Sequence, residues 1–196
     1  MHESFDESHD MPLKFPSSLP ALLLMAAFSA AVRAEPAHVH GVAALDISVQ
    51  GDTLRLALES PLDNLIGFEH APSGDGEHAK VRTMARQLRQ AWRWFVPNPE
   101  AACKLASVTL SSAVIAPVEL GEPVTKTAPA ASQAEPGHAD LDAGFVFQCA
   151  HPLALKTMEV RLFDAFAGFR QIQVQSVTAK RQSAARLTPD ARTFVW

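Results

Sequence analysis

Two histidines separated by one residue, His38 and His40, are the first side chains in this sequence whose spacing suits a defined chemistry. Residues 38–50 alternate between polar and apolar side chains, which is the period of a half-buried strand, so both imidazoles point to the polar face. Two imidazoles on one face can bind the same metal ion, and they supply half of a tetrahedral zinc site.

A second set of metal-ligand side chains repeats this spacing on a later predicted strand, at His138, Asp140 and Asp142. Imidazole nitrogens combined with carboxylate oxygens suit Zn²⁺. Exposed histidines and aspartates are also common on polar faces that bind no metal, so an ordinary solvated surface remains the alternative. Two further histidines, His78 and His151, are expected to be ordinary surface residues.

A hairpin must position the first pair of histidines. The apolar alternation resumes after a turn at residues 50–52, which predicts two antiparallel strands with Leu45 near Leu58. Extending this pairing away from the turn places His40 near Asp63. Because the chain continues within a few residues to Glu69 and His70, we expect separate segments to converge at this end of the hairpin.

One helix is predicted over about residues 77–95, with Asp75 as its N-cap. Its apolar stripe consists of Val81, Met84, Ala85, Leu88, Ala91, Trp92 and Phe95. The opposite face carries Arg82, Arg86, Arg89 and Arg93. The chain has a formal net charge of −4, and no aromatic platform accompanies the arginines. We therefore interpret this face as solvated, not as a nucleic-acid surface.

Short β-rich segments dominate the remainder of the chain. They are residues 103–115, 139–149, 157–163, 171–178, 184–187 and 193–196. The pattern predicts an α+β domain that is mainly antiparallel β-sheet with one amphipathic helix. The connection at residues 117–137 is rich in Pro and Ala, and we expect it to be flexible.

The two cysteines, Cys103 and Cys149, are expected to form one disulfide if the protein is exported, with two unpaired buried thiols as the alternative. If their strands pair antiparallel with the cysteines opposite each other, Val114 lies opposite His138. Such a disulfide would join neighbouring strands.

The N-terminal segment predicts export. Residues 1–34 are predicted to be a signal peptide, with an apolar stretch at 21–32 and small residues at the cleavage site, and we expect translation to start at Met11. A retained anchor is the alternative, but the apolar stretch is short for a membrane span of ~20 residues. The prediction is therefore a single exported domain at 35–196 without stable membrane insertion.

Common catalytic patterns are missing from the sequence, which has no H-E-x-x-H, no G-x-S-x-G and no phosphate-binding glycine loop. We therefore expect a protein that is not an enzyme. A zinc metallohydrolase remains a weaker hypothesis, with Glu69 as its candidate general base.

Several short strings resemble the ZrgA-like family of zinc-regulated periplasmic proteins, a domain of unknown function. The strings are His38-Val39-His40-Gly41-Val42-Ala43, Leu58-Glu59-Ser60-Pro61, Asn64-Leu65-Ile66-Gly67-Phe68-Glu69-His70-Ala71-Pro72, His138-Ala139-Asp140 and Phe147-Gln148-Cys149. The resemblance covers essentially the whole chain after residue 34. It implies a periplasmic protein of a Gram-negative bacterium, linked to zinc uptake, that binds Zn²⁺ and passes it to a transport system.

The resemblance also implies which residues bind the metal. His38, His40, His70 and His138 occupy motif positions of the family, with Asp140 and Glu69 as weaker candidates. Many members carry a histidine-rich tract before the H-A-D string, whereas residues 117–137 contain no histidine here. A zinc site is therefore expected on the folded domain, and an interaction module that binds no metal is the alternative hypothesis.

Overall fold

An antiparallel hairpin forms the centre of the structure, a computed structural model that describes residues 39–123, 139–179 and 181–196. Strand β1 (Val42–Gln50) pairs with β2 (Thr53–Pro61), and Leu45 lies opposite Leu58, which confirms the predicted register. The turn between them contains Gly51 at φ 60°, a conformation that tight hairpin turns require and glycine adopts without strain.

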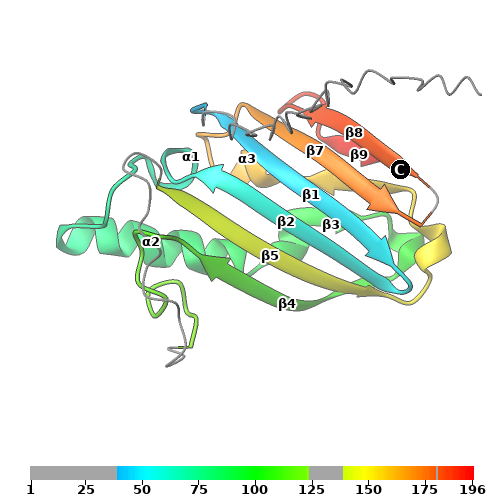
Figure 1. Ribbon diagram of the computed structural model, residues 1–196, viewed down its shortest axis with the longest axis horizontal. Helices are drawn as coiled ribbons and strands as arrows, with labels where there is room; N and C mark the ends of the chain where they lie inside the picture. The colour runs from blue at the N-terminus through cyan, green and yellow to red at the C-terminus, as the bar shows by residue number, and fades with distance from the viewer. Residues whose placement is uncertain (1–38, 124–138, 180) are drawn as a thin grey trace, which may run out of the picture. The chain divides into compact units, whose positions relative to one another are not determined.

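The hairpin lies inside a six-stranded sheet with the order β4-β5-β2-β1-β7-β8 (Figure 1). The other four strands are β4 (Cys103–Ser111), β5 (Asp140–Cys149), β7 (Gln171–Thr178) and β8 (Gln182–Leu187). Strands β1 and β7 are parallel, whereas the remaining pairs in this sheet are antiparallel. The α+β fold class and the dominance of antiparallel pairing are thus confirmed.

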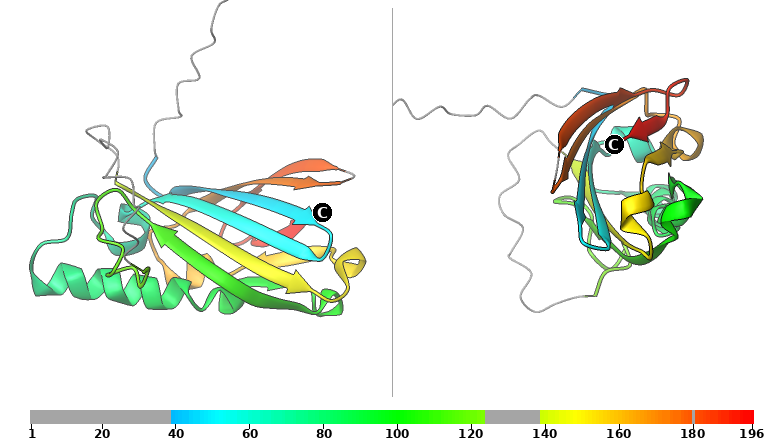
Figure 2. Two further views of the ribbon diagram at one scale, coloured as in Figure 1. Left: turned by 60° about the horizontal axis from the view of Figure 1, so that its bottom comes forward. Right: turned by 90° about the vertical axis from the view of Figure 1, so that its right-hand side faces the viewer.

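One face of this sheet is covered by a long helix and by a second, three-stranded sheet (Figure 2). The second sheet has the order β3-β6-β9 and consists of β3 (Phe95–Pro97), β6 (Thr157–Val160) and β9 (Thr193–Val195). The helices are α1 (Asp63–Ile66), α2 (Gly74–Leu88) and α3 (Leu162–Ala165), with 3₁₀ turns at Ala91–Arg93, Pro99–Ala101 and Pro152–Ala154. Within the described ranges, no helix combines the length and apolar character needed to cross a membrane.

A single apolar cluster joins these layers. Leu45 and Leu56 from the inner face of the large sheet, Met84 from α2 and Phe194 from β9 are each at most 2% exposed. Phe95 packs on Phe145 with ring centroids 4.8 Å apart. The leucines of β1 and β2 reach this core because, as the alternation predicts, every second side chain of these strands points to the same face.

The predicted helix at 77–95 has the expected buried stripe but different ends. Helix α2 begins after Ser73, so Asp75 is not its N-cap, and it ends at Leu88. The indole N–H of Trp94 and the backbone N–H of Gln90 both donate to the Gln87 carbonyl, which satisfies a C-terminal carbonyl and turns the chain away. Trp92 is therefore 62% exposed, and its assignment to the apolar stripe was wrong.

Two short helices occur where none was predicted. Helix α1 lies between the predicted hairpin and the predicted helix, and α3 begins where the predicted strand at 157–163 was expected to continue. Each helix has only four residues, so neither shows a periodic pattern in the sequence.

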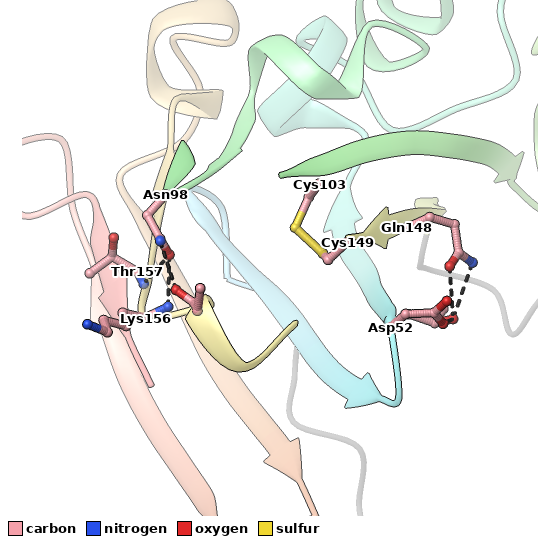
Figure 3. Close-up of a disulfide and its surroundings, with 9 residues drawn as sticks. Asp52, Asn98, Cys103, Gln148, Cys149, Lys156 and Thr157 are labelled. Carbon is pink, nitrogen blue, oxygen red and sulfur yellow. Dashed lines mark hydrogen bonds between the residues drawn. A yellow bond between two sulfur atoms is a disulfide. The ribbon is translucent and has the colours of Figure 1, made fainter. Parts of the chain in front are cut away.

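The disulfide between Cys103 and Cys149 is present, and the two residues are directly opposite each other in β4 and β5 (Figure 3). A bulge between Leu105 and Ser107 then shifts the register by one residue, and β4 ends at Ser111. The strand predicted over 103–115 is thus too long. Val114 lies beyond its end, and His138 lies outside the described residues.

The connection that was expected to be flexible starts as an anchored segment. Within residues 117–123 the side chain of Leu120 is fully buried. Arg89 donates to the Leu120 carbonyl (2.8 Å) and to Glu122 (2.6 Å), while Glu122 also accepts the Leu110 backbone N–H (2.8 Å). This arginine of the predicted solvated face is thus partly buried. Residues 124–137 of the connection lie outside the described residues.

Removing the disulfide should lower the free energy of unfolding. The bond closes a loop with a sequence separation of 46. The chain-entropy model gives a contribution of roughly 4 kcal/mol for a loop of this length. The combined substitution Cys103→Ala and Cys149→Ala should show this loss in urea denaturation. Dithiothreitol should destabilise the wild type and leave the variant unchanged, and a loss below about 1 kcal/mol would contradict the assignment.

Candidate functional site

An imidazole between two carboxylates forms the candidate site. Nε2 of His40 lies 3.2 Å from Oε1 of Glu69, and Nδ1 of the same ring lies 3.8 Å from Oδ2 of Asp63. The His40 side chain is 66% exposed, and those of Asp63 and Glu69 are 37% and 31% exposed. The group is therefore open to solvent and accessible to an ion.

The hairpin brings these three residues together. His40 lies in a turn that enters β1, and Asp63 is the first residue of α1, two residues after the end of β2. Because β1 and β2 are antiparallel, the start of β1 and the end of β2 are adjacent. Gly67 ends α1 at φ 80°, in the left-handed region, and reverses the chain so that Glu69 returns toward His40.

His70 lies in a different group. Its ring stacks on Phe68 with centroids 4.8 Å apart, and its Nε2 is 3.8 Å from Oε1 of Glu77 on α2. Glu77 accepts hydrogen bonds from the backbone N–H (2.7 Å) and hydroxyl (3.0 Å) of Ser73. The backbone bond is the main cause that lowers the pKa of the Glu77 carboxyl. His70 thus contacts the start of α2.

Asp140 lies on β5, the strand next to β2, at the same end of the sheet as His40. It is the first residue of β5 and is opposite Pro61, the last residue of β2. The preceding residue, Ala139, accepts the backbone N–H of Leu62 at 2.9 Å. Two residues further along β5, burial raises the pKa of Asp142. His38 and His138, the other predicted ligands, lie outside the described residues.

The described side chains do not form a complete metal site by themselves. Across residues 39–123, 139–179 and 181–196, no group of three or more His, Cys, Asp or Glu is arranged to hold a metal ion. His40 faces its two carboxylates through different ring nitrogens, which point in divergent directions, so the three side chains do not converge on one point.

One further imidazole–carboxylate pair has no signal in the sequence. Nδ1 of His78, which was expected to be an ordinary surface residue, lies 2.7 Å from Oε1 of Glu119, and Arg82 lies 3.8 Å from the same oxygen. Glu119 follows His78 by 41 residues. Only the packing of residues 117–123 on α2 brings the two together, so local spacing could not predict the pair.

These features define a small α+β domain whose exposed imidazole–carboxylate group offers nitrogen and oxygen donors suited to a divalent metal. Residues 37–196 match the family model described as ZrgA family zinc uptake protein, and the chain belongs to this family. The resemblance inferred from the sequence is thus confirmed, and the family supports a role linked to zinc uptake. The comparison with curated proteins gave no match.

The lowered pKa of Glu77 predicts a pH-dependent stability. Its carboxylate stabilises the folded state fully above its ordinary pKa of 4.5, and this contribution disappears as pH falls through the lowered value. Glu77→Gln should therefore lower the melting temperature at pH 7, and the difference from wild type should vanish in acid.

Melting curves of both proteins between about pH 7 and pH 3 measure this effect. Asp190→Asn, at an exposed position far along the sequence, is the control and should follow the wild type throughout. A difference between Glu77→Gln and wild type that stays constant with pH would contradict the role given to the Ser73 contact.

Proposed function

We propose that this protein binds Zn²⁺ at the end of the hairpin and assists zinc uptake by delivering the ion to a transport system. The observation that carries the proposal is the 3.2 Å approach of His40 Nε2 to Glu69 Oε1. One imidazole nitrogen and one carboxylate oxygen already face each other there. A small movement that lets Zn²⁺ enter between them would supply two ligands.

Asp63 completes this arrangement in a second role. When a histidine binds zinc through Nε2, its Nδ1–H commonly donates to a carboxylate, which fixes the ring orientation and raises its basicity. Oδ2 of Asp63 lies 3.8 Å from Nδ1 of His40 and is suited to this role. His38 and His138 are the proposed source of the remaining ligands, because they adjoin the turn and the strand that carry His40 and Asp140.

The proposed ligands suit an ion that must be released again. Both cysteines of the chain are used in the disulfide, so no thiolate is available to hold the zinc tightly. The 66% exposure of His40 leaves room for a ligand from a receiving protein. Zinc bound by nitrogen and oxygen ligands at an exposed site can pass to a partner by ligand exchange.

We place this activity in the periplasm of a Gram-negative bacterium and assign no catalytic reaction to the protein. The signal-like residues 1–34 and the disulfide support an oxidising compartment outside the cytoplasm. In a zinc hydrolase, Glu69 would have to act as a free general base. Its contact with His40 instead favours a role as a zinc ligand.

Calorimetric titration of Zn²⁺ into the untagged, metal-stripped protein tests the proposal. The wild type should bind zinc stoichiometrically, and His40→Ala should weaken binding at least about 100-fold, because loss of an outer-shell partner alone typically costs 10–100-fold. Glu69→Gln should weaken it comparably. Asp63→Asn should have a smaller effect, within about 10–100-fold.

Two further variants, one of them a control, locate the site. His151→Ala removes an exposed histidine beyond the opposite end of β5 and should leave zinc affinity unchanged. The combined His38→Ala and His138→Ala variant should lose affinity if these residues complete the coordination. Absence of zinc binding by the wild type would overturn the proposal and favour an interaction module without metal.

A further inference from the structure

We infer that Asn64 is the positioning residue of this site: its buried amide fixes the turn that carries His40 to the segment that carries Asp63. The inference rests on the proposed zinc function. Asn64 follows Asp63 in the chain and is 2% exposed, although it belongs to a helix of only four residues at the surface end of the hairpin.

The amide of Asn64 forms three hydrogen bonds. Its Oδ1 accepts the backbone N–H of Gly41 at 2.6 Å, and its Nδ2 donates to the carbonyl of Val42 at 3.0 Å. Nδ2 also donates to the hydroxyl of Ser60 at 3.2 Å. One side chain therefore holds the two residues that follow His40 and a residue near the end of β2.

The turn around His40 is fixed from its other side as well. The Val42 N–H donates to the Val39 carbonyl at 2.9 Å, which closes a β-turn with Gly41 at φ 87°, where glycine is unstrained. The carbonyl of Gly41 accepts the backbone N–H groups of Arg170 (2.8 Å) and Gln171 (2.9 Å). With Asn64 on its N–H and β7 on its carbonyl, the residue next to His40 cannot shift freely.

Asn64 itself is held in place by its surroundings. A Cβ atom added to Gly168 would collide with the Asn64 carbonyl oxygen, so the loop after α3 packs directly on the Asn64 backbone. The Ser60 hydroxyl that accepts from Asn64 is fully buried and donates to the Pro61 carbonyl at 3.1 Å. The amide is therefore a fixed point to which the exposed turn is attached.

This arrangement has a consequence for zinc affinity. The His40 side chain is exposed and that of Asp63 is partly exposed, so packing orients them only in part. Their relative position depends on the backbone that Asn64 joins. Loosening that backbone raises the entropic cost of holding the His40 ring, oriented by Asp63, at the ion, which is how supporting residues commonly control metal affinity.

The test compares Asn64→Ala with Asn98→Ala. Asn98 has a similar role near the disulfide, where its Oδ1 accepts the N–H groups of Lys156 (2.8 Å) and Thr157 (3.1 Å) and its Nδ2 donates to the Ala154 carbonyl (2.9 Å) (Figure 3). Both variants lose a side chain that joins two segments. Only Asn64→Ala should weaken zinc binding, by about 10–100-fold.

The readouts are Zn²⁺ affinity by calorimetry and the visible absorption of the Co²⁺-substituted protein. Asn64→Ala should change both, whereas Asn98→Ala should bind zinc within about 2-fold of wild type, with an unchanged Co²⁺ spectrum. If Asn64→Ala does not fold, the variant Asn64→Asp tests the positioning role instead. It keeps an acceptor for the Gly41 N–H but places an oxygen against the Val42 carbonyl. The zinc affinity of Asn64→Asp should lie between that of the wild type and that of His40→Ala.

The outcomes distinguish the two proposals. If the wild type binds zinc and His40→Ala weakens binding as expected, but the Asn64 variants bind like Asn98→Ala, the positioning role is wrong and the zinc site stands. If the wild type binds no zinc, the proposed function is overturned, and this inference fails with it.

Discussion

The antiparallel pairing of β1 with β2 is the constraint on which both the core and the candidate site depend. Leu45 and Leu58 face each other on the buried side, and a shift by one residue would turn every apolar side chain of one strand toward solvent. The same pairing brings the turn before β1 next to the helix after β2. The burial of leucines therefore also determines that His40 and Asp63 are neighbours.

This dependence explains how much the sequence could predict. The strict alternation allowed us to predict the hairpin, its register and the proximity of His40 to Asp63. The expected oxidising compartment allowed us to predict the pairing of Cys103 with Cys149. The bulge after Leu105 was missed, although the apolar residues change parity there, from Cys103 and Leu105 to Val108 and Leu110. The parallel pairing of β1 with β7 was missed because the alternation of a strand is the same in either chain direction.

The end of α2 and the minor contacts of the site depend on tertiary packing. The apolar spacing continues past Leu88 to Trp92, yet the helix ends where Trp94 and Gln90 both donate to the Gln87 carbonyl. His70 and Glu69 are adjacent in the sequence, but one faces α2 and the other faces His40. Asn64 resembles an ordinary loop residue until the loop after α3 and the buried Ser60 are known to surround it.

The source of the stability distinguishes this domain from one that zinc must fold. Structural zinc sites usually have four protein ligands, and the binding free energy of the ion is then part of the folding free energy. Here a continuous core of large apolar side chains and a disulfide hold the chain together, and the candidate ligands are exposed at one end of the sheet. Release of an ion from that end would not expose the core. The proposed delivery of zinc requires such a construction, because the protein would have to load and unload the ion while it stays folded.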